Sequence, residues 1–277
     1  MKTDLQIKEE RLYHILAGFD QVAVAFSGGV DSSYLLAACV DALGVARVRA
    51  LTADSPLLPR QELETARQIA QSLGVRHEVM AFDELSNPDI SANTNQRCYY
   101  CKRFRFEAIL ALLQQTGGAT LLHGENVDDA LDYRPGARAA RELGVRAPLA
   151  EAGLTKADIR ELSKRRGLAT WNLPSAACLA SRFPYDVPLT LEGLQRVEQA
   201  ETALRQIVSV HQLRIRDHYP VARIEVRPED IERLTAPAVR QRVVQALQSA
   251  GYHYVALDLE GYRTGSMNDR VDQPASQ

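Results

Sequence analysis

The sequence predicts an α/β protein with a parallel sheet, followed by a smaller α+β unit. Two observations lead to this prediction. Short apolar runs alternate with helical segments in the first part of the chain, and the pattern changes to helix, strand, strand, helix, strand toward its end. Strands that are joined through helices run parallel, and the helices then cover both faces of the sheet.

The first part of the chain contains four predicted strands. They are the apolar runs at 21–26, 46–53, 77–82 and 119–124. Between them, apolar residues recur every three or four positions, which predicts helices from 31, over about 57–74 and from about 98 to 115. Cys39 lies on the apolar stripe of the first of these helices, so we assign it to the core.

The pattern changes after about residue 150. Thr155 and Asp158 have the spacing of a capping box, which predicts a helix over 156–166. An irregular segment rich in proline and small residues follows, "TWNLPSAACLASRFPYDVP". We expect a first domain over 1–184 and a second over 185–277. The elements expected in the second are helices at 191–208 and 235–249 and strands at 212–216, 221–226 and 252–258.

The composition of the chain limits its partners. The 277 residues are 45% hydrophobic and 25% charged, and the formal net charge of −2 does not favour a large nucleic-acid footprint. No apolar run approaches the roughly 18 residues of a membrane helix. The first residues carry acids and no signal-peptide core. We therefore expect a cytoplasmic protein with reduced cysteines and no membrane partner.

The string "FSGGVDSS", between the first strand and its helix, has the composition of a phosphate cradle. Two glycines allow close approach of the backbone, hydroxyls surround them, and a helix N-terminus follows. No lysine is present, so the string differs from the loop of ordinary P-loop ATPases. A plain tight turn, with Asp31 as a helix-start carboxylate, is the alternative. The candidate phosphate-binding residues are Ser27, Gly28, Gly29, Asp31, Ser32 and Ser33.

The core of this string, "SGGVDS", resembles the signature of the PP-loop ATP pyrophosphatase superfamily. The resemblance implies a loop that binds ATP and a reaction in which adenylation activates a carboxylate or carbonyl oxygen. It implies a Mg²⁺ or phosphate-side role for Asp31, and a place for Ala53 beside adenine. "HGENVDD" resembles the second motif of the superfamily, which implies that Gly124, Asn126 and Asp128 lie near ATP. An ordinary strand-end turn is the alternative for this second string.

Further strings resemble the LarE family over nearly the whole chain. They are "RCYYCK", "DYRPG", "WN", "CLASRFPY" and "GYRTGSMND". This resemblance implies an ATP-dependent sulfur transferase that converts the carboxylates of pyridinium-3,5-dicarboxylate mononucleotide to thiocarboxylates, a step toward the nickel-pincer nucleotide. It also implies that Cys178 handles the sulfur. A buried structural cysteine is the alternative, since free cysteine is among the most buried residue types.

The pair Cys98 and Cys101 separates two branches of that family. In one branch a single cysteine gives up its own sulfur and is left as dehydroalanine. In the other, three cysteines hold a [4Fe–4S] cluster whose open iron carries sulfide. The presence of Cys98, Cys101 and Cys178 implies the cluster branch. A redox pair or a zinc pair is the alternative for the first two.

Charged residues of the second part are candidate substrate contacts. Glu201 falls on the apolar stripe of its helix, so it either pairs with an arginine or reaches into a site. Arg214 and Arg216 share one strand face, which suits a phosphate group or else a solvated outer face. Arg182 suits a carboxylate or a thiolate. Three aromatic residues, Tyr99, Tyr100 and Trp171, are candidates for stacking on a pyridinium ring or for core packing.

Three other functions compete with this prediction. A PP-loop tRNA thiolase also carries cysteines, but the charge balance and the absence of a recognisable RNA module argue against it. An ammonia-using ligase leaves the three cysteines unexplained. A nucleotide-sensing module with structural zinc leaves Cys178 unused. The predicted partners are therefore a small mononucleotide and a sulfide source, and the family resemblance implies a homo-oligomer.

Overall fold

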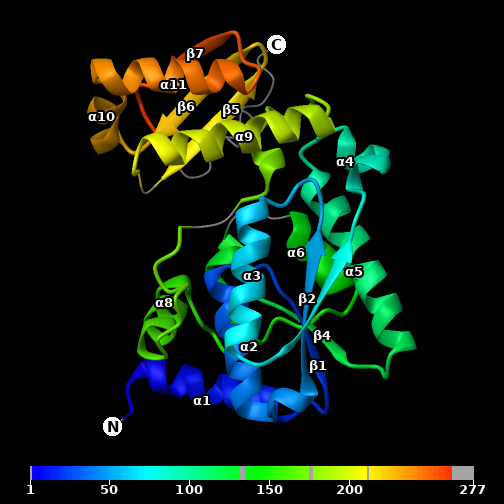
Figure 1. Cartoon of the computed structure of the whole chain (residues 1–277). Coiled ribbons are helices and arrows are strands. Elements are labelled where there is room, and N and C mark those ends of the chain that lie inside the picture. The colour runs from blue at the N-terminus through cyan, green and yellow to red at the C-terminus, as the bar shows by residue number, and fades with distance from the viewer. Residues whose placement is uncertain (1, 132–134, 175–176, 211, 264–277) are drawn as a thin grey trace, which may run out of the picture. The chain divides into compact units, whose positions relative to one another are not determined.

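The computed structural model describes residues 2–131, 135–174, 177–210 and 212–263 (Figure 1). The strings "DYRPG" and "GYRTGSMND" lie largely outside these residues. The chain forms two compact units. The N-terminal unit comprises Met1–Glu84 and Cys98–Ala176, and the C-terminal unit comprises Leu85–Arg97 and Ala177–Gln277. The division into domains at 184/185 stays a prediction.

The N-terminal unit is built on a four-stranded parallel sheet with the order β3-β2-β1-β4. All four strands were predicted. The order places β2 and β4 on opposite sides of β1, because the chain runs from β1 outward through β2 to β3 and then returns past β1 to β4. Ligands of open α/β sheets bind where the strand order reverses in this way, at the carboxyl ends of the strands. The strands are β1 (Val22–Ala25), β2 (Val48–Asp54), β3 (Arg76–Ala81) and β4 (Thr120–His123).

Helices cover both faces of this sheet, as expected. On one face Val22 and Val24 of β1 pack in a cluster with residues of five helices, and on the other face Ala23 packs in a cluster that includes α5. Cys39 is fully buried in the first cluster, which confirms its assignment to the core. The longer helices are α1 (Asp4–Ala17), α2 (Val30–Leu43), α3 (Arg60–Ser72), α5 (Arg97–Gln115) and α8 (Lys156–Arg165).

Helix α1 was not predicted. It buries only Leu12 and Leu16 completely, so its apolar stripe is short, and it begins with a capping box between Thr3 and Gln6. Single-turn and other short helices were not predicted either. They are η1 (Val45–Arg47), η2 (Glu84–Ser86), α4 (Pro88–Ser91), η3 (Val127–Leu131), α6 (Pro135–Glu142), α7 (Pro148–Glu151), η4 (Leu179–Arg182), η5 (Pro228–Asp230) and α10 (Ile231–Thr235).

The C-terminal unit contains a three-stranded sheet of order β5-β6-β7. Strands β5 (Leu213–His218) and β6 (Val221–Val226) are antiparallel, and β7 (Tyr254–Leu257) runs parallel to β6. Helices α9 (Leu191–Ile207) and α11 (Pro237–Ser249) share a hydrophobic core with this sheet. These five elements confirm the predicted order of helices and strands.

Among the residues that the structure describes, no helix combines the length and the apolar character needed to cross a membrane.

Candidate functional site

The loop between β1 and α2 is held close to α3. Gly28 has a positive φ of 75°, and a Cβ atom at this position would lie 3.0 Å from the backbone nitrogen of Ala66. Glycine is therefore required both by conformation and by space. Gly29 is the N-cap of α2 and makes no side-chain capping hydrogen bond. The loop thus leads directly into a helix N-terminus, where backbone N–H groups favour an anion.

The loop hydroxyls hydrogen-bond to one another. Ser32 Oγ lies 3.1 Å from Ser27 Oγ and donates to the carbonyl oxygen of Gly29 at 3.2 Å. Ser27 is exposed, whereas Ser32 and Ser33 are buried. The turn therefore keeps its shape through its own side chains, and Ser27 presents a hydroxyl at the surface of the loop.

The second predicted motif packs against the first. A Cβ atom on Gly124, at the end of β4, would lie 2.9 Å from the backbone nitrogen of Ser32 and 3.1 Å from the carbonyl carbon of Asp31. Only glycine lets the two segments approach so closely. The two strings identified in the sequence are therefore neighbours at the point where the strand order reverses.

The remainder of the second motif is tightly ordered by hydrogen bonds. Asn126 is buried, its backbone N–H donates to Asp129 Oδ2 at 3.0 Å, and its side-chain oxygen accepts from the N–H of Asp128 at 3.0 Å. Asp128 Oδ2 in turn accepts from the backbone N–H of Lys156 at 2.8 Å. The Lys156 ammonium lies 2.5 Å from Asp31 Oδ2. The sequence reasoning missed Lys156, since nothing local marks it.

The end of β2 contributes a buried threonine beside the loop. The Thr52 hydroxyl donates to the carbonyl oxygen of Phe26 at 2.7 Å, so it accepts from His77 Nε2, which is 2.8 Å away. Burial, with a smaller effect from Arg67, lowers the pKa of His77 below its usual value. Ala53, the predicted neighbour of adenine, follows Thr52 and is half-buried.

A lysine and a histidine meet at the end of β4. Lys102 Nζ lies 3.4 Å from Nδ1 of His123, and Nε2 of the same ring lies 3.6 Å from Glu125 Oε2. Burial, together with the nearby Lys102 ammonium, lowers the pKa of His123 from 6.5 to about 3. The ring is therefore neutral at physiological pH, and Lys102 remains the cation of this pair.

Cys98 and Cys101 lie at the start of α5. Cys98 is exposed and Cys101 is half-buried, and a spacing of three residues places them on one side of the helix. Tyr99 between them is buried, donates to Glu142 at 2.5 Å and lies under the guanidinium of Arg138. The structure thus gives Tyr99 a packing role. Among the described residues, no three His, Cys, Asp or Glu side chains are gathered in a way that could hold a metal ion.

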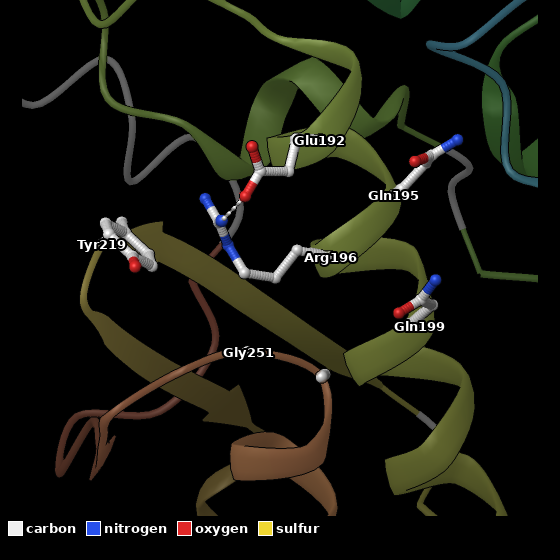
Figure 2. A pocket seen from close by; sticks show the side chains of 7 residues that line it. Glu192, Gln195, Arg196, Gln199, Tyr219 and Gly251 are labelled. Atoms are coloured by element: carbon white, nitrogen blue, oxygen red, sulfur yellow. Dashed lines mark ion pairs between the residues drawn. The ribbon is translucent and has the colours of Figure 1, made fainter.

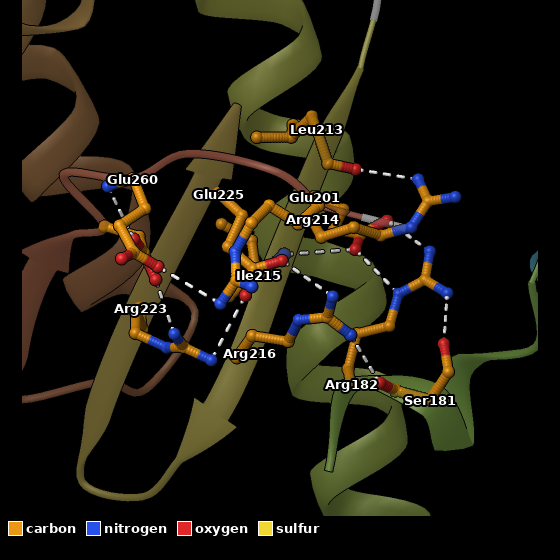
Figure 3. A network of polar contacts seen from close by, with 12 residues as sticks. Ser181, Arg182, Glu201, Leu213, Arg214, Ile215, Arg216, Arg223, Glu225 and Glu260 are labelled. Carbon is orange, nitrogen blue, oxygen red and sulfur yellow. Dashed lines mark hydrogen bonds and ion pairs between the residues drawn. The ribbon is translucent and has the colours of Figure 1, made fainter. Parts of the chain in front are cut away.

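In the C-terminal unit, the turn that carries Cys178 is held by a buried arginine, Arg182, which Figure 3 labels together with Ser181. The Arg182 guanidinium donates to the carbonyl oxygens of Ala177 at 2.6 Å and Cys178 at 3.1 Å, and to Ser181 Oγ at 2.9 Å. Cys178 itself is half-buried. The guanidinium therefore fixes the backbone of a turn that carries a partly accessible thiol.

Glu201 holds that arginine in place. Its two oxygens accept from Arg182 Nε at 2.9 Å and from Arg182 Nη2 at 3.1 Å. Arg205 and the backbone N–H of Ile215 also donate to it, at 2.9 and 3.1 Å. Burial alone would raise the pKa of Glu201, but Arg182 and the other arginines outweigh it and lower the pKa to about 2. Of the two alternatives left open for Glu201, the structure shows pairing with arginine.

The arginines of β5 are buried, so the alternative of a solvated strand face is wrong. Arg216 donates to the carbonyl oxygen of Ser181 at 2.6 Å and to Glu225 Oε2 at 2.6 Å (Figure 3). Arg214 lies over the ring of Tyr262. Burial and the neighbouring arginines lower the pKa of Arg214 to about 10. The segment around Ser181 and the side chain of Glu225 on β6 contact Arg216 on this face. The alternation of residues along β5 alone could not predict these contacts.

A shallow pocket of about 170 Å³ in the C-terminal unit contains none of the predicted site residues. Figure 2 shows Arg196 at its centre, between Glu192 and Tyr219. Arg196 pairs with the buried Asp217 at 3.0 Å and lies 4.3 Å from the centre of the Tyr219 ring. These contacts satisfy the arginine within the fold. We assign this pocket no ligand.

The doubly covered parallel sheet and its paired loops define a PP-loop ATP-pyrophosphatase domain, found in enzymes that activate substrates with ATP. A family model described as NAD synthase matches residues 11–99. An uncharacterized protein of Synechocystis is 41% identical over 95% of this chain and 98% of its own length. The pyridinium-3,5-bisthiocarboxylic acid mononucleotide synthase of Lactiplantibacillus plantarum is 37% identical over 96% of both chains. The chain belongs to the family of this synthase, the LarE family.

Proposed function

We propose that this protein is an ATP-dependent sulfur transferase that converts the carboxylates of pyridinium-3,5-dicarboxylate mononucleotide to thiocarboxylates. The observation that carries the proposal is the end-to-end similarity to the Lactiplantibacillus plantarum synthase. The product of this reaction is the precursor of the nickel-pincer nucleotide. The packing of Gly124 against the first turn of α2, and the turn that presents Cys178, supply the parts that such chemistry needs.

In the first step a carboxylate oxygen of the substrate attacks the α-phosphorus of ATP, and pyrophosphate leaves. This step replaces a poor leaving group on the acyl carbon with AMP. Ser27, Gly28 and Gly29, with the N-terminus of α2, bind the phosphates. Ala53 lies beside adenine, and Gly124, Asn126 and Asp128 complete the site.

Mg²⁺ belongs to this proposal as the partner of the phosphates. It prefers hard oxygen ligands, and the carboxylates of Asp31 and Asp128 supply them at the two neighbouring loops. Both carboxylates are connected to Lys156 in the structure, so the donor set fits a site where cations neutralise acidic oxygens. When bound, the ion would draw negative charge from the phosphate oxygens.

In the second step a sulfur nucleophile attacks the acyl carbon and AMP leaves. Cys178 is the residue assigned to this sulfur. The guanidinium of Arg182 donates to the backbone carbonyl oxygen of Cys178 and so holds the turn that presents the thiol. Glu201 orients Arg182, and the guanidinium groups of Arg214 and Arg216 would contact the substrate phosphate and carboxylate.

Two sources of sulfur are open to a chain with these cysteines. In the first, the Cys178 thiolate forms a thioester, and loss of its Cα proton breaks the Cβ–S bond and leaves dehydroalanine. In the second, Cys98, Cys101 and Cys178 would hold a [4Fe–4S] cluster, which would supply a site for sulfide from an external donor. The exposed thiol of Cys98 and the half-buried thiol of Cys101 on one helix side suit two of its ligands.

The first step is tested by labelling both carboxylates of the substrate with heavy oxygen. Adenylation transfers one labelled oxygen to each AMP that is released, and mass spectrometry of AMP detects it. Unlabelled AMP, or release of ADP, would refute the proposal. The family resemblance alone supports a cytoplasmic homo-oligomer. Light scattering of the purified protein tests the oligomeric state.

A further inference from the structure

The segment that follows β7, residues 258–263, turns back onto the end of β6. Gly261 has a positive φ of 73°, and a Cβ atom at this position would lie 2.6 Å from the carbonyl oxygen of Val226. That same oxygen accepts a hydrogen bond from the backbone N–H of Tyr262 at 2.7 Å. Glycine is therefore required at the turn, and the turn fixes the backbone of Tyr262 beside the last residue of β6.

A run of alternating charges anchors the start of the same segment (Figure 3). The Arg223 guanidinium pairs with Asp258 at 2.5 Å and with Glu225 at 3.1 Å. Glu225 pairs in turn with Arg216 at 2.6 Å. Asp258 also accepts from the backbone N–H of Glu260 at 2.9 Å. Side chains of β6 therefore connect the segment to the face of β5 on which Arg216 lies.

The ring of Tyr262 contacts the other arginine of that strand face. Leu213 lies opposite Val226 in the β5–β6 hairpin, so the residue that bonds to Val226 lies near the start of β5. The guanidinium carbon of Arg214 is 5.7 Å from the centre of the Tyr262 ring. Arg214 is buried, and Tyr262 is half-buried. The segment thus brings an aromatic ring to a buried cation.

Arg214 lies where a positive charge is costly. Burial, together with repulsion from Arg182, lowers its pKa to about 10, and Glu201 acts in the opposite direction. An aromatic ring attracts a cation through its face and uses none of the N–H donors of a guanidinium. A carboxylate in the place of Tyr262 would neutralise the charge and occupy donors. The ring therefore stabilises the guanidinium and preserves the positive charge that attracts an anion.

We propose that Tyr262 is a positioning residue that holds the Arg214 guanidinium in place for the phosphate group of the substrate. The string "GYRTGSMND", to which Tyr262 belongs, then has a part in the site. This inference rests on the part of the proposed function that assigns Arg214 to the substrate phosphate. It does not depend on the source of the sulfur.

Two further residues of the C-terminal unit supply matched variants. Tyr219 also lies over an arginine, with its ring centre 4.3 Å from Arg196. Tyr219→Ala therefore removes a similar contact at a place to which we assign no ligand. Gly261→Ala keeps the Tyr262 ring but adds a Cβ atom 2.6 Å from the carbonyl oxygen of Val226, which displaces the turn.

The test is calorimetric binding of pyridinium-3,5-dicarboxylate mononucleotide, and of the corresponding nucleoside without its phosphate, to the full chain. We expect Tyr262→Ala to weaken the mononucleotide about fivefold or more, the loss expected for one cation–π contact. The nucleoside affinity should stay unchanged, since a phosphate-specific effect spares it and a misfolded variant loses both ligands. Tyr262→Phe keeps the ring and should match the wild type, as should Tyr219→Ala. Gly261→Ala should behave like Tyr262→Ala.

A second measurement tests the contact without any substrate. Phenylglyoxal modifies accessible guanidinium groups, and peptide mass spectrometry gives the rate for each arginine. Relative to the exposed Arg242, modification of Arg214 should be several-fold faster in Tyr262→Ala than in the wild type or in Tyr262→Phe. An equal rate in all three proteins would overturn the inference.

The binding series can overturn the inference as well. Equal loss of mononucleotide and nucleoside in Tyr262→Ala would show a general structural role, and a loss in Tyr262→Phe would assign the effect to the hydroxyl group. A wild type that binds neither ligand would refute the substrate of the proposed function. In that case the phenylglyoxal rates still decide whether Tyr262 holds Arg214.

Discussion

Replacement of Glu201 by glutamine tests the buried network that holds the Cys178 turn. The substitution keeps the size of the side chain and removes its charge, so Arg182 loses its paired carboxylate. The pKa of Glu201 falls from 4.5 to about 2 on folding. One pKa unit corresponds to about 1.4 kcal/mol, so the charged form contributes about 3 kcal/mol to the stability of the folded state. Loss of one partner of a buried ion pair costs a similar amount, about 3–5 kcal/mol.

The assay is urea denaturation of the wild type and of Glu201→Gln at a series of pH values. The unfolding of the C-terminal unit is monitored in each titration. Because the folded pKa is depressed, the contribution of Glu201 is present above the unfolded pKa near 4.5. It decreases as the pH falls toward about 2. The difference in unfolding free energy between the two proteins should therefore be largest at neutral pH and should shrink below pH 4.5.

Glu192→Gln is the matched control. Glu192 lies on the same helix, also pairs with an arginine, and its side chain is 90% exposed. This control should leave stability almost unchanged at every pH. A cost below about 1 kcal/mol for Glu201→Gln, the size typical of surface pairs, would refute the reasoning. A cost that does not change with pH would refute it equally.

Three further outcomes follow from the site. Gly124→Ala should weaken ATP binding by about tenfold or more in calorimetry, because its Cβ would lie 2.9 Å from the backbone of the phosphate loop. Gly18→Ala is the control and should leave ATP binding unchanged, since its Cβ would meet only a carbonyl oxygen at 3.3 Å. Cys178→Ser should still release pyrophosphate but form no thiocarboxylate. Loss of pyrophosphate release, or formation of thiocarboxylate by this variant, would contradict the role assigned to Cys178. Cys39, fully buried and with its pKa raised to about 12 by burial, should resist iodoacetamide under native conditions. Cys98, which is exposed, should react first, and mass spectrometry of the alkylated peptides decides.

The strands and the phosphate loop could be predicted because their signals are local. Apolar runs mark β1 to β4, and a glycine pair between a strand and a helix marks the loop. The neighbourhood of Gly124 and the loop followed from the rule that parallel strands end at the same edge. Helix α1 was missed because its apolar stripe is short, although its capping box between Thr3 and Gln6 could have been recognised.

The ion pairs of the site could not be predicted in the same way. Lys156 contacts Asp31 only because α8 begins beside the end of β4, and no spacing along the chain shows this. The pairing of Arg216 with Glu225 depends on the register of the β5–β6 hairpin, in which Arg214 lies opposite Glu225. Working out that register from the turn would have shown an acidic partner for the arginines.

The most direct test of the account is the product that the anaerobically purified protein forms from ATP, Mg²⁺ and pyridinium-3,5-dicarboxylate mononucleotide. Mass spectrometry measures both the small-molecule products and the intact chain after the same reaction. The account predicts a product in which sulfur replaces a carboxylate oxygen, with one AMP released for each sulfur transferred. Loss of the elements of H₂S from the chain would identify Cys178 as the donor, and an unchanged chain with iron bound would identify the cluster route. AMP release with an amide product, or with no sulfur in the product, would contradict the account.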